Sequence, residues 1–349
     1  MGQSKKTPII FVTGASRSGT TMTSRILGNH TEILSTRELH YFGDLCNSSL
    51  LEDVISNEEA LYAVSKLHAR FQRGLWKDKR TNEDDKFAKK VINETADHDR
   101  TPKVLFLEAV EKFLFGSQKT TLCEQTPRNI FYADQLLDLH DQVRIVHLTR
   151  DPRAVLASQK NRWRQRAMGR KNIPLREVWR VRVNYHPLTI CKLWVKANRC
   201  ALRLATHPRL LIMKFEDIVN NPIQCTRQMC DFLGISFQPK MIEVPQMGSS
   251  HQLNTGDTGV SAASIDKWKD QLTQKEIAVC ELLTKNLMEK FGYTTLSSTR
   301  MGRFSYIHQL ATYPLHFAGV AITNPRRAWI QANAMWTGLR TRNQRSNGG

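Results

Sequence analysis

Apolar and polar residues follow two alternating patterns along the chain. Four short apolar runs, each bounded by turn residues, are Ile9 to Thr13, Thr120 to Glu124, Val143 to Thr149 and Leu210 to Lys214. Stretches with helical periodicity separate them, and several of these begin at a proline suited to a first helical turn. Strands that alternate with helices predict an α/β fold, in which helices flank a central parallel sheet in a three-layer sandwich.

The pattern also divides the chain. Helices are expected at Thr20 to Leu27, Leu51 to Phe71, Pro127 to Leu139, Pro152 to Trp163, Ile190 to Ala205, Pro222 to Leu233 and Thr273 to Phe291. The charged segment Lys77 to Arg100 is expected to be an exposed insertion. Residues 300–349 hold seven arginines, no lysine and no acidic residue. We therefore expect one domain over residues 1–299 and a basic, aromatic tail over residues 300–349, which either packs on the domain or contacts a membrane interface.

Composition narrows the class of protein only partly. The 349 residues are 40% hydrophobic and 24% charged, which is ordinary for a soluble globular protein. The net charge of +19 would suit nucleic acid, an anionic membrane surface or a polyanionic small ligand. Seven cysteines without a CxxC pair predict a reducing cytoplasm and no metal site. The apolar run near the N-terminus is too short for a signal peptide or a membrane span.

A glycine-rich loop lies between the first predicted strand and the first helix. It contains Gly14, Ala15, Ser16, Arg17, Ser18 and Gly19. Such a loop directs backbone N–H groups and the positive end of a helix at one phosphate. Nucleoside triphosphatases place a lysine after the second glycine, whereas here Thr20 and Thr21 follow Gly19 and the cation is Arg17. The loop thus suits a 5′-phosphate carrying a transferring group, although alone it could be a simple turn.

A second anion site is expected where the strand Val143 to Thr149 ends. Arg150 follows this strand, Asp151 and Pro152 turn the chain, and the next helix carries Ser158. Arg150 and Ser158 could converge on a second phosphate through charge-assisted hydrogen bonds. An arginine at a strand end also commonly forms a surface ion pair. The second phosphate site is therefore supported mainly by its combination with the glycine-rich loop.

Together the two stretches resemble the signature elements of sulfotransferases that use 3′-phosphoadenosine 5′-phosphosulfate (PAPS). The stretch from Arg17 to Thr21 resembles their 5′-phosphosulfate loop, and Arg150 to Arg153 with Ser158 resembles their 3′-phosphate strand and helix. The resemblance implies a P-loop-like fold, PAPS as co-substrate and no metal. It also explains the absent lysine, because this donor has no γ-phosphate. The donor-binding residues it implies in this part of the chain are Gly14, Ser16, Arg17, Ser18, Gly19, Thr20, Thr21, Arg150 and Ser158.

The segment "LSTRELHYFG", residues 34–43, resembles the acceptor side of the Golgi-type and bacterial branches, which include tyrosylprotein and heparan sulfotransferases. A glutamate there is the general base in those enzymes, and Glu38 is the matching residue. The chemistry requires such a group, because the acceptor hydroxyl must lose a proton as it attacks sulfur. The resemblance therefore implies Glu38 as the catalytic base and Arg17 as the residue that stabilises the departing phosphate. Arg37 and His40 are neighbours with weaker claims.

Two further stretches complete the resemblance. Residues 259–273 look like the family's late loop over the nucleotide, which makes Lys267 and Trp268 candidates for the adenine or the 3′-phosphate. A Trp at a helix start more often packs in the core, so core packing competes with the nucleotide role of Trp268. In "LCEQTPRNIF" this chain has Gln125 where the family often has a lysine. The role of that lysine is either lost here or taken over by Arg128.

The leading hypothesis is a PAPS-dependent sulfotransferase acting on an acceptor hydroxyl of a glycan, a lipid or a small metabolite. A P-loop kinase of a small metabolite would need a lysine in the loop and a metal-binding acid, and neither is evident. A nucleic-acid-binding protein would need clustered basic residues, whereas here they are spread along the chain. A catalytically inactive nucleotide-binding module is disfavoured by Glu38.

Overall fold

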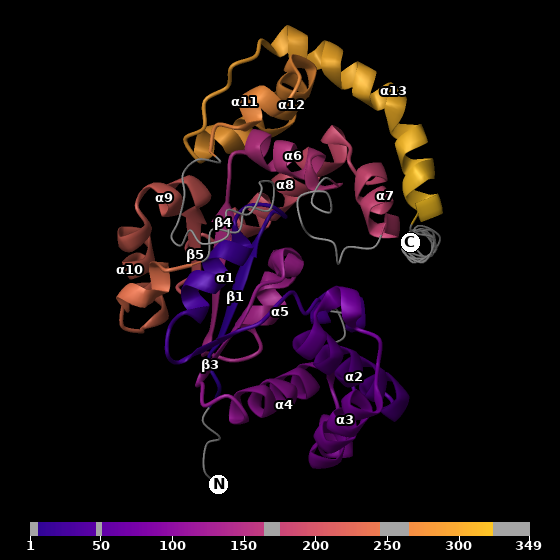
Figure 1. Cartoon of the computed structure of the whole chain (residues 1–349), viewed down its shortest axis with the longest axis vertical. Coiled ribbons are helices and arrows are strands. Elements are labelled where there is room, and N and C mark those ends of the chain that lie inside the picture. Colours follow the sequence, from indigo (N-terminus) through magenta and orange to yellow (C-terminus); the bar gives the residue numbers. More distant parts are fainter. Residues whose placement is uncertain (1–5, 47–50, 164–174, 245–264, 324–349) are drawn as a thin grey trace, which may run out of the picture. The chain divides into compact units, whose positions relative to one another are not determined.

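A five-stranded parallel sheet forms the centre of the fold (Figure 1). The computed structural model describes residues 6–46, 51–163, 175–244 and 265–323. The strands are β1 (Ile9–Gly14), β2 (Ile33–Ser35), β3 (Thr121–Glu124), β4 (Val143–Thr149) and β5 (Leu210–Lys214), in the spatial order β2-β3-β1-β4-β5. The predicted parallel α/β sheet is confirmed, and β2 is a strand that the sequence pattern did not reveal.

The order of the strands explains why the sheet core is so apolar. β1 lies in the middle, with Ile9 paired to Leu122 of β3 on one side and to Val143 of β4 on the other. Every residue of β1 is buried, as expected for a parallel strand that helices cover on both faces. Because the strands are parallel, the segments that follow β1, β2, β3 and β4 all begin at the same edge of the sheet, which is where open α/β sheets bind ligands.

Helices make up most of the remaining described chain. They are α1 (Thr20–Gly28), α2 (Asn57–Arg73), α3 (Asn82–Glu94), α4 (Pro102–Phe115), α5 (Ala133–Leu137), α6 (Pro152–Lys160), α7 (Leu175–Val183), α8 (Pro187–Arg203), α9 (Phe215–Asn220), α10 (Pro222–Leu233), α11 (Trp268–Gln271), α12 (Gln274–Lys290) and α13 (Thr299–Thr323). Each predicted helix overlaps one of these. The predicted helices did not include α3, α4, α7, α9, α11 or α13. The predicted helix Leu51 to Phe71 begins later, where Ser56 forms a capping box.

The segment Lys77 to Arg100 is exposed at most positions, as predicted, but one face of it is buried. This segment contains α3, which packs with α2 and α4 into a three-helix group (Figure 1). Val91 has no exposed surface, and Asp84 is equally buried because it accepts hydrogen bonds from Arg73 and His68. Burial alone would raise the pKa of Asp84, but these partners outweigh it and lower the pKa to about 2. The many charges of this segment hid a helix with one buried face.

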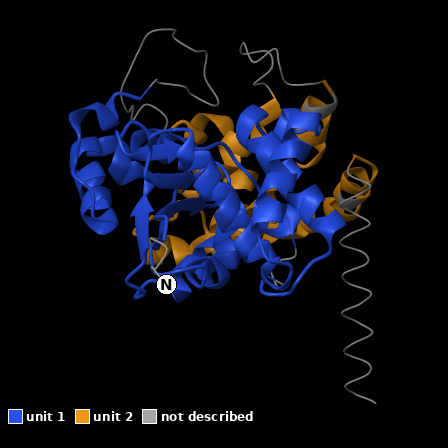
Figure 2. Ribbon diagram, turned by 90° about the horizontal axis from the view of Figure 1, so that it is seen from below, with its two compact units in different colours: residues 1–150, 194–246, 255–265 blue, residues 151–193, 247–254, 266–349 orange. Residues whose placement is uncertain are grey.

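The chain divides into two compact units, drawn in different colours in Figure 2. One comprises residues 1–150, 194–246 and 255–265 and holds the whole sheet. The other comprises residues 151–193, 247–254 and 266–349 and holds α6, α7 and α11 to α13. The tail that begins at residue 300 is described as far as Thr323, where it forms most of α13. A separate domain boundary at residue 300 stays a prediction.

Candidate active site

The predicted phosphate loop joins β1 to α1, and its two glycines are required by close packing. A Cβ atom on Gly14 would lie 2.6 Å from the carbonyl oxygen of Leu148 on the neighbouring strand. Gly19 has a φ of +96°, and a Cβ there would lie 2.4 Å from the ring of Phe215. Only glycine fits both positions without displacing backbone or ring. The loop is therefore held tightly between β4 and α9.

The polar side chains of the loop differ in exposure. Ser18 is completely buried, and its hydroxyl has no hydrogen-bond partner within the described part of the chain. Thr20 is buried at the start of α1, whereas Ser16 and Thr21 are exposed and Arg17 is half-buried. Arg17 has a φ of +80°, which bends the loop at the residue that carries its cation. A buried hydroxyl without a partner at the N-terminal end of a helix is a suitable donor for an oxyanion.

Arg150 lies directly against this loop. Its Nη1 donates a hydrogen bond of 3.2 Å to the carbonyl oxygen of Arg17, and its guanidinium lies 4.1 Å from the centre of the Phe215 ring. The backbone of Arg150 is fixed as well, because the Trp194 indole N–H donates to its carbonyl oxygen at 2.9 Å. The structure therefore brings together Arg17 and Arg150, two predicted donor-binding residues that are far apart in the sequence.

The other predicted donor-binding residues belong to the second compact unit. Ser158 is buried on α6, and Trp268 is buried at the start of α11. The Trp268 ring lies 4.1 Å from the guanidinium of Arg153, which also pairs with Asp151. These contacts place Trp268 among packed side chains of its unit. Roles for Ser158, Lys267 and Trp268 at a nucleotide stay predictions.

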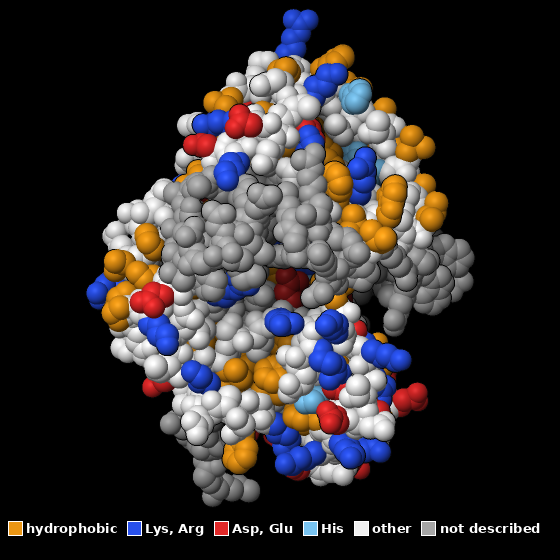
Figure 3. Space-filling model, viewed as in Figure 1, with side chains coloured by type: hydrophobic (Ala, Val, Ile, Leu, Met, Phe, Trp, Pro, Cys, Tyr) orange, Lys and Arg blue, Asp and Glu red, His pale blue; other side chains and the backbone are white. Residues whose placement is uncertain are grey.

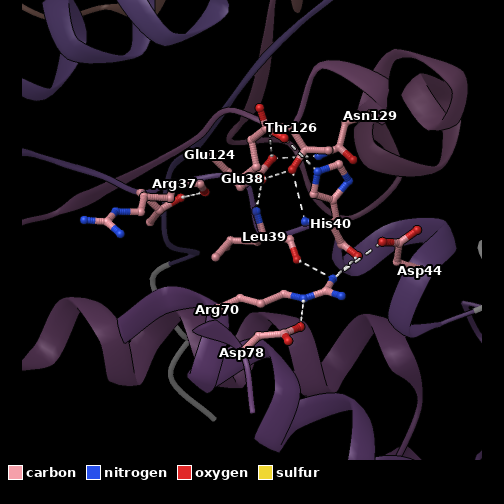
Figure 4. Close-up of polar contacts among 11 residues, drawn as sticks. Arg37, Glu38, Leu39, His40, Asp44, Arg70, Asp78, Glu124, Thr126 and Asn129 are labelled. Carbon is pink, nitrogen blue, oxygen red and sulfur yellow. Dashed lines mark hydrogen bonds and ion pairs between the residues drawn. The ribbon is translucent and has the colours of Figure 1, made fainter. Parts of the chain in front are cut away.

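Glu38 and His40 form a hydrogen-bonded pair in the segment after β2 (Figure 4). His40 Nε2 donates to Glu38 Oε2 at 2.8 Å, and within the described residues the carboxylate has no other partner. The Glu38 side chain is 40% exposed, whereas that of His40 is 11% exposed. One carboxylate oxygen is therefore held by the imidazole, and the other faces outward.

Two residues from β3 and its following turn hold the backbone of this pair. The N–H of Leu39 donates to Glu124 Oε1 at 3.0 Å, and the N–H of His40 donates to Thr126 Oγ1 at 3.1 Å. Glu124 also accepts hydrogen bonds from Thr126 and Asn129, so the network is continuous (Figure 4). Burial raises the pKa of Glu124, although these donors act in the opposite direction. A buried carboxyl group thus ties the Glu38 segment to the sheet edge.

A third anchor comes from α2. Arg70 Nη1 donates to the carbonyl oxygens of Leu39 and His40, at 2.9 and 3.1 Å, and its Nε donates to Asp78 at 2.9 Å. His40 has a φ of +48°, a left-handed conformation that costs energy in a residue with a Cβ. The hydrogen bonds at its N–H and C=O hold that conformation. The same bend turns the His40 ring toward Glu38 (Figure 4).

The sequence singled out Glu38 as a candidate base but did not identify the residues that hold its segment in place. A signal existed for Glu124, because a charged residue ends an otherwise apolar parallel strand. Nothing in the sequence around Arg70 indicated its role, because it lies 30 residues from His40 on another helix. Arg37, by contrast, is exposed and donates to the carbonyl oxygen of Arg73, away from the pair.

The structure also shows the surroundings of Gln125, which stands where the family often has a lysine. Gln125 is buried, and its side-chain oxygen has no partner within the described residues, whereas Arg128 is exposed. Across the described residues, no group of three or more His, Cys, Asp or Glu side chains is arranged to hold a metal ion. The predicted independence of metals is left to experiment.

Comparison with known proteins agrees with this geometry. A model of the sulfotransferase family matches residues 8–239, more than half of the chain. Carbohydrate sulfotransferase 1 of Danio rerio is 23% identical over 176 residues, which cover 45% of this chain and 39% of that protein. Carbohydrate sulfotransferase 3 of Mus musculus is 27% identical over 172 residues, which cover 46% of this chain and 35% of that protein. The chain thus spans less than half the length of these relatives.

Solved structures show the same fold. The sulfotransferase domain from the curacin biosynthetic pathway has a TM-score of 0.51 at 19% identity, covering 84% of this chain and 100% of that domain. The sulfotransferase domain from the Synechococcus PCC 7002 olefin synthase has the same TM-score at 22% identity, covering 84% and 98%. With the family match over the sheet, the phosphate loop and the Glu38 segment, these findings show that the chain belongs to the sulfotransferase family.

Proposed function

We propose that the chain transfers a sulfuryl group from PAPS to a hydroxyl group of a carbohydrate, releasing adenosine 3′,5′-bisphosphate. The observation that carries this proposal is the contact between Arg150 and the lysine-free phosphate loop. This contact supports a phosphate site at the loop, with the guanidinium of Arg150 beside it for a second phosphate. The carbohydrate acceptor is inferred from the names of the relatives; a lipid or a small metabolite would require the same chemistry at the hydroxyl.

The residues of the loop fit such a donor. The buried Ser18 hydroxyl has no partner within the described residues, and Gly14 and Gly19 let the loop pack closely against Leu148 and Phe215. We assign the 5′-phosphosulfate to Gly14, Ser16, Arg17, Ser18, Gly19, Thr20 and Thr21, and the 3′-phosphate to Arg150 and Ser158. Lys267 and Trp268 remain candidates for the nucleotide.

In this mechanism, Glu38 accepts the proton of the acceptor hydroxyl as its oxygen forms a bond to sulfur. The bond between sulfur and the bridging oxygen breaks, and that oxygen leaves with the 5′-phosphate. Arg17 and the loop N–H groups stabilise the negative charge that develops on it. His40 keeps one oxygen of Glu38 in place, so that the other is directed outward toward an acceptor. Nothing in this scheme requires a metal ion.

Removal of metal ions gives a first test. Transfer of labelled sulfate from PAPS to a fractionated glycan extract should be unchanged by exhaustive chelation, because cationic side chains and N–H groups supply the charge stabilisation. ATP labelled at its γ-phosphate, with magnesium, should be a poor donor. A strict magnesium requirement together with phosphoryl transfer from ATP would instead support the kinase hypothesis.

The anchor from α2 gives a second test. Arg70→Met should lower turnover by about tenfold or more while changing donor affinity little, because misplacement of a catalytic group by about 1 Å can cost a hundredfold. Lys66→Met is the matched control, since Lys66 pairs with the same Asp78 at 2.9 Å and, among the described residues, donates hydrogen bonds to Asp78 alone. Equal losses of turnover in both variants, with equal losses of thermal stability, would contradict a positioning role for Arg70.

A further inference from the structure

The long helix α13 packs its small and polar residues and exposes its apolar ones. A Cβ on Gly302 would lie 3.0 Å from the carbonyl oxygen of Ala278 on α12, and Ser305 beside it is buried. Toward the other end, a Cβ on Gly319 would lie 3.1 Å from Val183 on α7. These contacts identify the face of α13 that lies against its own unit. An ordinary surface helix would place its large apolar residues there.

The opposite face carries large apolar side chains instead. The exposed fractions are 69% for Phe304, 66% for Ile307, 78% for Leu315 and 80% for Ile322. The exposed Ala311 and Ala318 complete the three- and four-residue spacing of a single helix face. Figure 3 shows hydrophobic side chains gathered along this part of the molecule. We call these six residues, Phe304, Ile307, Ala311, Leu315, Ala318 and Ile322, the α13 apolar face.

Charge indicates what covers this face. Arg300 and Arg303 lie in the first turns of α13, and residues 300–349 contain seven arginines and no acidic residue. A second copy of the chain packed face to face would bring these like charges together, which is unfavourable. A partner that is both apolar and negatively charged matches the face and its arginines. An anionic lipid bilayer has both properties.

We propose that the α13 apolar face docks in the interfacial layer of a membrane that contains anionic lipids. The helix then lies in the plane of the membrane: in the described part of the chain, no helix has both the length and the apolar character needed to cross one. The arginines pair with lipid headgroups while the apolar side chains enter the boundary with the acyl chains. This inference is independent of the chemistry assigned to the active site.

The test is co-sedimentation of the full chain with vesicles of phosphatidylcholine, with or without phosphatidylserine. We expect binding to the phosphatidylserine vesicles that weakens as salt is added. Phe304→Gln combined with Leu315→Gln should lower the partition coefficient about tenfold or more, because two large apolar side chains no longer enter the interface. Arg300→Gln should lower it about fivefold for the anionic vesicles alone.

Phe115→Gln is the matched control, since Phe115 is 94% exposed at the end of α4 and lies outside α13. This variant should bind vesicles as the unaltered chain does. The proposal is overturned if the chain does not bind anionic vesicles, or if the α13 double variant binds as well as the control. It is also overturned if the double variant converts a dimer into a monomer without affecting vesicle binding, because a second copy would then be the partner. Vesicle binding that arises only after removal of residues 324–349 would identify this segment as the occupant.

Discussion

Glu38→Gln should abolish most turnover while leaving donor binding nearly intact. The amide keeps the shape of the side chain and can still contact His40, but it cannot take a proton from the acceptor hydroxyl. A positioned general base contributes about 10²- to 10⁴-fold, so a loss of this size is expected in kcat. The dissociation constant of the donor should change only a few-fold. Any change should be toward tighter binding, because a negative charge near the sulfate is removed.

Steady-state kinetics with a defined acceptor, together with calorimetric titration of PAPS in the absence of acceptor, measure the two effects separately. Glu32→Gln is the matched control, because Glu32 is an exposed carboxylate at the amino end of β2, the end opposite to Glu38. Near-normal turnover of Glu38→Gln on its true acceptor would remove Glu38 as the base. His40 would then be the next candidate.

Arg150→Ala should raise the Michaelis constant for PAPS about ten- to a hundredfold, because a charge-assisted contact to phosphate is worth about 1.5 to 3 kcal/mol. Arg150 also donates to the backbone of Arg17 and lies over Phe215, so part of the loss would come from a less ordered loop. Arg150→Lys should recover some affinity through its charge but not the planar contacts of the guanidinium.

Arg144→Ala provides the control on the same strand. Arg144 lies near the amino end of β4, where it donates to the carbonyl oxygen of Asp141, far along the strand from the loop. Thermal unfolding of each variant separates a folding defect from a binding defect. Equal affinity of the unaltered chain and Arg150→Ala for adenosine 3′,5′-bisphosphate would exclude Arg150 from the donor site.

Periodicity identified most of the sheet because parallel strands are buried on both faces and read as continuous apolar runs. β1 and β4 are examples. β2 was missed because it has only three residues, too few to produce a pattern. α3 was misjudged because its net composition is charged, although one face is buried against α2 and α4. The hydrophobic pattern of a segment thus reflects its composition but does not show which other segments it packs against.

The candidate site likewise has a part that the sequence predicted and a part that it did not. The contact between the glycine-rich loop and Arg150 was predictable because each follows directly after a strand, and the ends of parallel strands meet at one edge. The supports of Glu38 were not, since Arg70 reaches it from another helix and Glu124 from another strand. Their spacing in the sequence carries no information about a contact that only folding creates. Trp268 shows both sides of this limit: core packing was one of its two sequence interpretations and it is buried, but its partner Arg153 could not be identified from the sequence.

The most direct test of a PAPS site is a calorimetric comparison of adenosine 3′,5′-bisphosphate with adenosine 5′-monophosphate, without added metal. If Arg150 holds a 3′-phosphate beside the loop, the bisphosphate should bind about ten- to a hundredfold more tightly. Arg150→Ala should remove most of that difference, and Arg144→Ala should preserve it. Equal affinities for the two nucleotides in the unaltered chain, or a preference for ATP with magnesium, would contradict the assignment of this site to PAPS.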